Sequence, residues 1–342
     1  MELQITWFVL WSVLWAVYFM LDGFVLGAGM LHRFLGRNDG ERRVIINTFG
    51  PVWDGNEVWL ITAGGATFAA FPTTYALMFS YLYTALLLLL FALIVRGVSF
   101  EFRSKLEGDR WKGAWDTAIL VCSFLPALLF GVAFGNIFRG LPMDASGYQG
   151  SFLSLLNPFG LLTGALFVLL FLVHGALYLS AKTEGDLSRR ALSAANRFWP
   201  ALLVTAALFL VAAYPATRLY DNYLRVPVLL AVPLLAVVSL VSIRVFSAKN
   251  KVLASFAASC ATIVLVVVTG VTGLFPNLIP SSIDPAYSLT IFNSSSSQYT
   301  LKIMTVVALI FVPIVIAYKI WVYRIFREKV TEAEVMGDEQ AY

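Results

Sequence analysis

The sequence predicts an all-α membrane protein whose chain crosses the bilayer several times. Of its 342 residues, 59% are hydrophobic and only 13% are charged, whereas about a quarter of the residues in an ordinary soluble domain are charged. Apolar stretches of roughly twenty residues recur along the chain, and each is long enough at about 1.5 Å per residue to cross a hydrocarbon core of about 30 Å. These observations exclude a water-soluble fold, which could not cover so much apolar surface.

Charged residues, proline and glycine divide the apolar sequence into nine expected spans, which form a single integral membrane domain over residues 1–342. The expected spans are 5–31, 44–70, 74–98, 113–140, 157–181, 199–217, 227–246, 252–274 and 300–323. The first six residues contain Glu2 but no lysine or arginine, so the basic head of a cleaved signal peptide is missing. The first span is therefore expected to remain a helix.

The basic residues predict the orientation of the chain in the membrane. If the amino terminus lies outside, twenty lysines and arginines, Arg96 among them, fall in cytoplasmic segments, and four fall outside. The outer four are Arg139, Arg218, Arg225 and Lys302. Because basic residues near span ends stay on the cytoplasmic side, the carboxyl terminus is expected in the cytoplasm. This placement also explains the net charge of +4 without a nucleic-acid partner.

The second expected span differs from the others because it contains Asp54, Asn56 and Glu57 inside an apolar run. A structural helix has no need of these residues. A carboxylate within a span costs about 2.5–3.5 kcal/mol on insertion scales, so it usually faces a protein interface or water and marks a path for protons, ions or substrate. A desolvated carboxylic acid also has its pKa raised towards neutrality, which suits proton transfer.

Depth in the membrane links these residues to Asp22 of the first span. Asp22 lies about nine residues from the inner end of its span and Asp54 about ten from the inner end of the second, which places both roughly 14–15 Å from the cytoplasmic side. Glu57 follows Asp54 by three positions, on nearly the same helix face and one turn deeper. The three carboxylates are expected to line one half-channel that opens to the cytoplasm.

Structural explanations for the same residues remain open. Asp54 would merely cap a helix that starts near Glu57 if it lay in an interfacial loop. Asp22 would serve only an interhelical hydrogen bond beside Gly23 and Gly27, two glycines that allow another helix to approach closely. An assembly scaffold without proton transfer therefore remains an alternative. A secondary transporter is another, because polar residues with glycine and proline within spans also mark discontinuous substrate-binding helices.

Few residues in the sequence are suited to bind a cofactor or a metal. The two histidines, His32 and His174, lie in separate helices, where a lone histidine more often packs or donates a hydrogen bond than ligates. Met30 and Met304 are weaker candidates for axial haem ligands. The sequence contains no haem-attachment, zinc, phosphate-loop or nucleophile-elbow motif. We therefore expect no metal and no haem ligands from this chain.

Several ordered blocks of the sequence resemble subunit II of cytochrome bd-type quinol oxidases. They run from about residue 20 to residue 325, and together they are far more specific than any one block. The blocks are 21–31 (LDGFVLGAGML), 33–39 (RFLGRND), 50–66 (GPVWDGNEVWLITAGGA), 68–72 (FAAFP), 131–136 (GVAFGN), 156–160 (LNPFG), 275–276 (FP), 280–282 (PSS) and 294–301 (SSSSQYTL).

The resemblance implies a subunit of an inner-membrane complex of aerobic respiration, which oxidises a quinol and reduces oxygen to water with cytoplasmic protons. In that family every haem ligand belongs to subunit I, so haems b and d, or b only, are expected there, and this chain is not catalytic alone. The family fold is nine helices, arranged as two four-helix bundles and one peripheral helix. The expected partners are subunit I, quinol, membrane lipid and a small single-helix accessory subunit, together with a structural quinone.

The resemblance also implies roles for particular residues. It points to Asp54 and Asp22 as members of a proton pathway, and it places Glu57 and Trp59 in the same block, Trp59 as an aromatic of an interface or a substrate path. The family often has a second acidic residue where this chain has Val25. A relay through that position cannot operate here, so either the pathway depends more on Asp54 or Asp22 is mainly structural.

Overall fold

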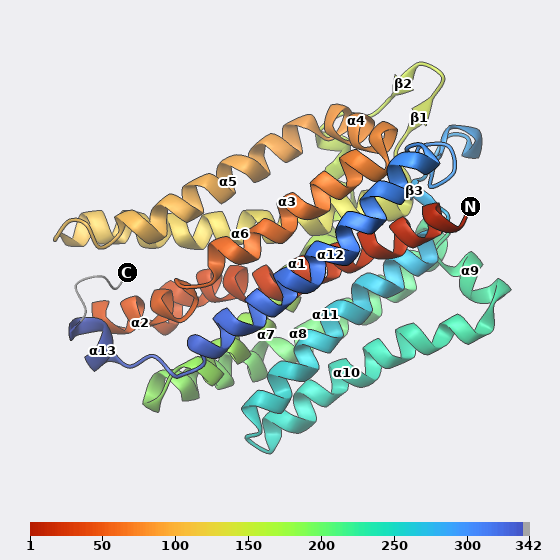
Figure 1. Ribbon diagram of the computed structural model, residues 1–342. Helices are drawn as coiled ribbons and strands as arrows, with labels where there is room; N and C mark the ends of the chain where they lie inside the picture. Colours follow the sequence, from red (N-terminus) through yellow and green to blue (C-terminus); the bar gives the residue numbers. More distant parts are fainter. Residues whose placement is uncertain (338–342) are drawn as a thin grey trace.

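A computed structural model of the chain describes residues 1–337, which fold almost entirely into helices (Figure 1). The last five residues of the expected domain, 338–342, lie outside the described part. The α-helices are α1 (Glu2–Leu35), α2 (Asp39–Phe49), α3 (Trp53–Ala70), α4 (Pro72–Tyr81), α5 (Tyr83–Phe102), α6 (Asp109–Arg139), α7 (Pro158–Lys182), α8 (Gly185–Ala216), α9 (Tyr220–Arg225), α10 (Ala231–Ala248), α11 (Val252–Leu274), α12 (Gln298–Ile325) and α13 (Glu332–Gly337).

Short elements occupy the connections between the helices. Three 3₁₀ turns are η1 (Leu153–Leu156), η2 (Pro227–Leu230) and η3 (Pro285–Tyr287). Two antiparallel pairs of very short strands join β1 (Met143–Asp144) to β2 (Gly147–Tyr148) and β3 (Asn277–Ile279) to β4 (Leu289–Thr290). These strands lie at the same end of the molecule as the amino terminus, whereas α2 and α13 lie at the opposite end (Figure 1).

Eight helices within residues 1–337 are long and apolar enough to cross a membrane. They are α1, α5, α6, α7, α8, α10 together with η2, α11 and α12. This result confirms the predicted all-α polytopic fold. The count of nine spans and their arrangement as two four-helix bundles with one peripheral helix stay predictions.

The second expected span, 44–70, is wrong as a single helix. The chain breaks after Phe49, and a new helix, α3, begins at Trp53. Pro51 lies in the break, where it lacks the backbone N–H that a continuous helix would use. The 18 residues of α3 include Asp54, Asn56 and Glu57, and this polar content explains why α3 is not among the eight apolar helices.

Two other expected spans also differ from the observed helices. The third, 74–98, is built from α4 and α5, which meet at Leu82. The sixth was expected to begin at residue 199, but α8 begins at Gly185. Its first turns bury Leu187, Ala191 and Ala195 at a spacing of four residues, so this segment is an amphipathic helix despite its charges.

Helix α1 lies at the centre of the molecule and packs against α3, α6, α7 and α11. Its contact with α7 is backbone against backbone, because a Cβ added to Gly27 would collide with the carbonyl oxygen of Phe171. From the other side of the same contact, a Cβ added to Gly175 of α7 would collide with the backbone nitrogen of Ala28 in α1. These glycines permit the close approach that fixes α1, and with it Asp22, in the core.

Helix α12 has an entirely different environment. None of the residues in its most apolar stretch is buried against the rest of the chain. Neighbouring α3 exposes Val58, Ile61 and Phe68 as well, and the two helices lie side by side at the front of the molecule (Figure 1). A large apolar surface is therefore left on this side for lipid or for another subunit.

Candidate functional site

The buried carboxylates of α1 and α3 meet at one arginine. Arg96 of α5 donates from Nη2 to both carboxylate oxygens of Asp22, at 2.9 and 3.0 Å, and to Oε1 of Glu57 at 2.5 Å. The side chains of Arg96 and Asp22 are fully buried, and that of Glu57 is 22% exposed. Two carboxylates thus share one guanidinium, which leaves the cluster with an excess of negative charge when both are ionised.

Some polar groups of this cluster are hydrogen-bonded to one another, and others have no partner in the described part of the chain. Tyr18 donates its hydroxyl to Oδ2 of Asp22 at 3.1 Å, from one turn earlier on the same face of α1. The Nε and Nη1 groups of Arg96 are buried and have no acceptor within residues 1–337. Because buried donors are nearly always hydrogen-bonded, these two groups call for an acceptor other than a side chain of this part of the protein.

Asn56 holds α3 in the position that brings Glu57 to the cluster. Its amide nitrogen donates to the carbonyl oxygen of Leu21 in α1 at 3.0 Å, and its amide oxygen accepts from the hydroxyl of Tyr323 in α12 at 2.9 Å. Asn56 is fully buried. One side chain therefore ties three helices together, next to the residue pair Asp22 and Glu57.

Asp54 does not join Asp22 and Glu57 at the arginine. It is the second residue of α3 and is exposed, and its carboxylate accepts a hydrogen bond from the adjacent backbone N–H of Gly55. The estimate that placed Asp54 about ten residues inside a span relied on an unbroken helix from residue 44, so the break before Trp53 overturns it. The capping alternative is wrong too, because the N-cap residue of α3 is Val52.

Trp59, expected at an interface or along a substrate path, is buried inside the chain and only 9% exposed. Its indole N–H has no acceptor within the described residues. The indole N–H of Trp11, by contrast, donates to Thr67 Oγ1 at 2.9 Å, which joins α1 to α3 further along. In this structure the ring of Trp59 belongs to the packing between helices rather than to the exposed face of α3.

Arg96 is the member of the site that sequence reasoning missed. It was counted among the cytoplasmic basic residues because it lies near the inner end of the third expected span. A signal was present, since Arg96 stands between Val95 and Gly97 in an otherwise apolar run. An arginine there must find a carboxylate, and Asp22 and Glu57 are the carboxylates that were already expected inside the membrane.

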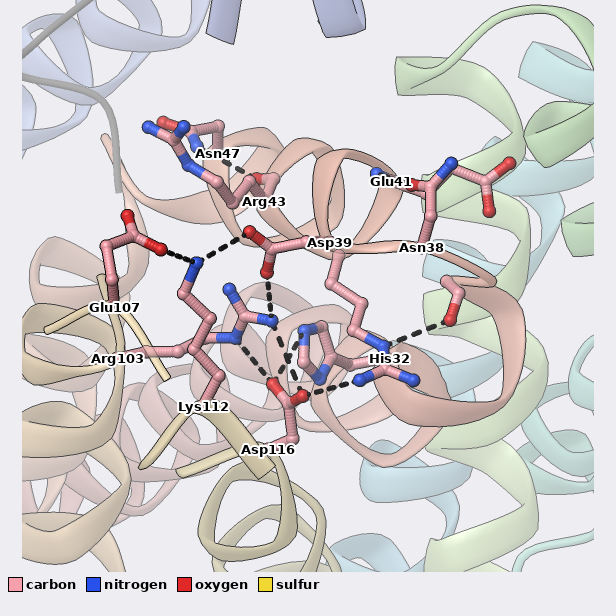
Figure 2. Close-up of polar contacts among 12 residues, drawn as sticks. His32, Asn38, Asp39, Glu41, Arg43, Asn47, Arg103, Glu107, Lys112 and Asp116 are labelled. Carbon is pink, nitrogen blue, oxygen red and sulfur yellow. Dashed lines mark hydrogen bonds and ion pairs between the residues drawn. The ribbon is translucent and has the colours of Figure 1, made fainter. Parts of the chain in front are cut away.

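A second polar cluster joins the carboxyl-terminal ends of α1 and α5 to the first turns of α6 (Figure 2). At its centre Asp116, fully buried, accepts from Arg103 Nε at 2.5 Å and from Arg42 Nη1 at 2.8 Å. The Nε2 atom of His32 lies 3.6 Å from the same carboxylate. Arg103 extends the cluster to the edge of the protein, because its Nη2 also donates to Asp39 at 2.9 Å. This network holds the first turn of α2, through Asp39 and Arg42, against α5 and α6.

Asp39 is the titratable carboxylate at the exposed edge of this cluster. Burial by itself would raise the pKa of Asp39, but hydrogen bonds from Lys112 and Arg103 outweigh burial and lower the pKa below its ordinary value of 3.8. Since the folded-state pKa is depressed, the ionised carboxylate stabilises the fold above pH 3.8, and this stabilisation is lost as the pH falls through the lower folded-state pKa.

We expect Asp39→Asn to destabilise the protein by up to about 1 kcal/mol near pH 7, because its side chain is partly exposed. The difference from the unmodified protein should shrink on acidification below about pH 4, since the native carboxylate is then protonated too. Thermal unfolding followed by tryptophan fluorescence measures this. Glu107→Gln, which removes the 90% exposed partner of Lys112, serves as the control and should change little. A stability difference that stays constant down to about pH 3 would contradict the assignment.

The two histidines have different surroundings. Both ring nitrogens of His174 are hydrogen-bonded, Nδ1 to Ser259 Oγ at 2.7 Å and Nε2 to the carbonyl of Met20 at 2.9 Å, and the ring stacks on Phe256. His32 is fully buried beside Asp116, and neither of its ring nitrogens has a hydrogen-bond partner within the described residues. Within residues 1–337 no three His, Cys, Asp or Glu side chains are grouped as metal ligands.

Comparisons with known proteins match nearly the whole chain. The family model described as cytochrome bd terminal oxidase subunit II matches residues 3–326. Cytochrome bd-I ubiquinol oxidase subunit 2 of Escherichia coli (strain K12) is 39% identical, over 97% of this chain and 96% of the relative. Cytochrome bd ubiquinol oxidase subunit 2 of Bacillus subtilis (strain 168) is 40% identical, over 98% and 99%.

A solved structure shows the same fold. The bd oxidase from Geobacillus thermodenitrificans contains a chain that superposes with a TM-score of 0.78 and covers 95% of this chain and 99% of that chain. The two sequences are 17% identical. At that identity the likeness concerns the fold alone, and the sequence relatives carry the family assignment.

Proposed function

The chain belongs to the cytochrome bd terminal oxidase subunit II family, and from this premise we propose that it is the haem-free partner of a haem-bearing subunit I and contributes a cytoplasmic proton path. Its relatives are subunits of ubiquinol oxidases, so the chain works within a membrane-bound oxidoreductase complex of the bacterial inner membrane. A secondary transporter receives no support from the family assignment.

The exposed apolar face of α3 and α12 supports a partner subunit on this side. Helix α12 is unburied along its most apolar stretch, and Asp54 lies on the exposed part of the neighbouring helix α3. If subunit I covers this face, Asp54 becomes part of the contact between the subunits. In the complex, subunit I then carries the haems b and d, or b only, and oxidises the quinol.

The proton path that we propose begins at Asp54 and continues to Glu57 and Asp22. Glu57 lies three residues after Asp54, on the same side of α3 and one turn further in, and it is joined to Asp22 through Arg96. Within residues 1–337, the buried Nε and Nη1 groups of Arg96 have no acceptor. Because water is the ordinary partner of such donors, these groups favour a hydrated path. This cluster of charged groups inside the membrane is the observation that supports the proposal most strongly.

Several further features follow from the family resemblance and are proposed with it. The amino terminus lies outside and the carboxyl terminus in the cytoplasm, in one integral membrane domain of nine spans in which α3 supplies the second. A small single-helix accessory subunit, membrane lipid and a structural quinone complete the complex.

The proposed function is tested by a reduced-minus-oxidised visible spectrum of the tagged chain, purified alone and after co-expression with its candidate haem subunit. We expect haem bands and quinol-dependent oxygen uptake only in the co-purified sample. Both ring nitrogens of His174 are already hydrogen-bonded, which supports this expectation. Haem bands from the lone chain, or a pair that never associates, would show that the proposal is wrong.

A further inference from the structure

Three of the four basic residues expected on the outer side of the membrane line a single groove. The groove has a volume of about 700 Å³ and includes Arg139, Arg218 and Arg225 among its lining residues. Arg139 is the last residue of α6, Arg218 lies in the turn after α8, and Arg225 is the last residue of α9. Because basic residues are normally depleted on this side, their convergence from three separate connections needs a physical reason.

The three arginines have no anionic partner from the part of the chain that the structure describes. All three side chains are exposed, and none takes part in an ion pair there. Six other arginines of the described part are paired with carboxylates: Arg37, Arg42, Arg96, Arg103, Arg189 and Arg190. One carboxylate, Asp221, also lines the groove, so the four charged groups sum to an excess of positive charge.

An apolar cavity of about 130 Å³ adjoins this groove, and the two share Phe138 and Leu219 as lining residues. The apolar cavity lies between α7, α8, α10 and α11, with side chains such as Ala206, Phe209 and Leu240 in its wall. A positively charged groove and an apolar cavity thus lie next to each other, separated by the side chains of Phe138 and Leu219, which suits a molecule with an anionic head and a hydrocarbon chain.

The short helix α9 forms the boundary between the two compartments and is firmly held. Tyr220 and Tyr223 line the apolar cavity, whereas Asp221 and Arg225 line the groove. Tyr223 donates its hydroxyl to the carbonyl oxygen of Thr269 in α11 at 2.6 Å. The amide of Asn222 donates to the last carbonyls of α11, with distances of 3.0 Å to Thr272 and 3.1 Å to Gly273. The site is therefore built into the fold before any ligand binds.

We propose that this groove binds an anionic phospholipid of the outer leaflet, with its phosphate on Arg139, Arg218 and Arg225 and a short stretch of one acyl chain in the apolar cavity. Guanidinium groups suit a phosphate because their N–H donors match its oxygens. On the cytoplasmic side of membranes, basic pockets between transmembrane helices bind anionic lipid head groups, and we expect the same chemistry to act in this groove.

The surroundings favour a lipid over a protein partner or a neutral quinone. Exposed apolar side chains of α8 and η2 flank the site, among them Leu208, Val211 and Val228. Tyr214 is exposed and its ring lies 5.5 Å from that of Tyr220, centre to centre. Tyrosines in this position mark the level of the lipid head groups. A neutral quinone head would leave the positive charge of the groove unbalanced.

Native mass spectrometry of the delipidated complex, purified with its haem-bearing partner, tests the proposal. Phosphatidylglycerol and phosphatidylcholine with the same acyl chains are added in parallel. We expect the unmodified complex to retain phosphatidylglycerol at least about tenfold better, and Arg218→Gln/Arg225→Gln to lose this preference. Lys302→Gln is the matched control, because Lys302 is the fourth outer basic residue and lies outside the groove; this variant should keep the preference.

Two further arms separate the head group from the acyl chain. Ala206→Phe fills the apolar cavity and should weaken retention of phosphatidylglycerol while the arginines stay in place. Inorganic phosphate in large excess should not displace the lipid; if it does so completely, the groove is a site for a free anion and the lipid proposal is wrong.

Other outcomes would also overturn the proposal. Equal retention of the two lipids by the unmodified complex is one. A second such outcome is that the arginine variants lose the partner subunit while their lipid binding stays unchanged. The arginines would then contact the partner protein rather than a lipid. Haem spectra and quinol-dependent oxygen uptake of the same samples test the oxidase function separately, so failure of the lipid site is distinguishable from failure of the proposed function.

Discussion

Replacing Arg96 by glutamine is expected to lower the free energy of unfolding by about 3–5 kcal/mol, which is the typical cost of breaking a buried ion pair by removal of one partner. Arg96 is the common partner of Asp22 and Glu57, and its side chain is fully buried. The variant leaves two carboxylates facing each other without a counter-charge. We expect reduced yield of the assembled complex and a lower midpoint of thermal unfolding, followed by tryptophan fluorescence.

Two comparisons show whether the loss comes from the unpaired carboxylates. Arg110→Gln makes the same chemical change at an exposed position and should have almost no effect. Adding Asp22→Asn and Glu57→Gln to Arg96→Gln removes the unpaired charges and should recover much of the lost stability, because apolar or neutral replacements of a whole buried pair are often tolerated. A triple variant that is less stable than Arg96→Gln would show that the arginine acts through packing alone.

Replacing Asp54 by asparagine is expected to slow quinol-dependent oxygen reduction by about 10²-fold, the lower part of the range for loss of a positioned proton-transfer group. The haem spectrum and the stability of the complex should stay nearly unchanged, since Asp54 is exposed on this chain and its carboxylate accepts a hydrogen bond from the neighbouring backbone N–H of Gly55 rather than from another helix of the described part. Oxygen uptake with excess quinol, normalised to haem content, measures the effect.

The control for Asp54 is Asp109→Asn, which removes another exposed carboxylate expected on the cytoplasmic side, at the first residue of α6. This variant should retain full turnover. Asp54→Glu keeps a titratable group and should restore much of the activity, with a changed dependence of rate on pH. Full turnover of Asp54→Asn would mean that Asp54 takes no part in proton transfer, and the scaffold alternative would then be preferred.

The two carboxylates of the buried cluster have different expected roles from Asp54. Asp22 is fully buried and accepts two hydrogen bonds from Arg96 and one from Tyr18, so its substitution alters structure as well as proton transfer. Val25, which stands where the family often has an acidic residue, is fully buried in the apolar core. Valine cannot relay a proton, so the proposed proton path depends more on Asp54 and Glu57.

The sequence by itself determined the environment, the fold class and the candidate carboxylates. Its apolar runs leave no alternative to helices in a bilayer, because a backbone in hydrocarbon must satisfy its own hydrogen bonds. Asp22, Asp54 and Glu57 were identifiable because ionisable residues in such runs are costly. The ordered sequence blocks were sufficient for the family assignment, which the comparisons confirm.

Only the tertiary structure decided which charged groups meet. Arg96 lies 74 positions from Asp22 in the sequence, and no local pattern specifies that pair, because it depends on how α1, α3 and α5 pack. The same is true of the break before α3, which moved Asp54 from an expected depth in the membrane to the first turn of a helix. Arg139, Arg218 and Arg225 gather in one groove for the same reason: helix packing, rather than sequence spacing, sets the distances between connections.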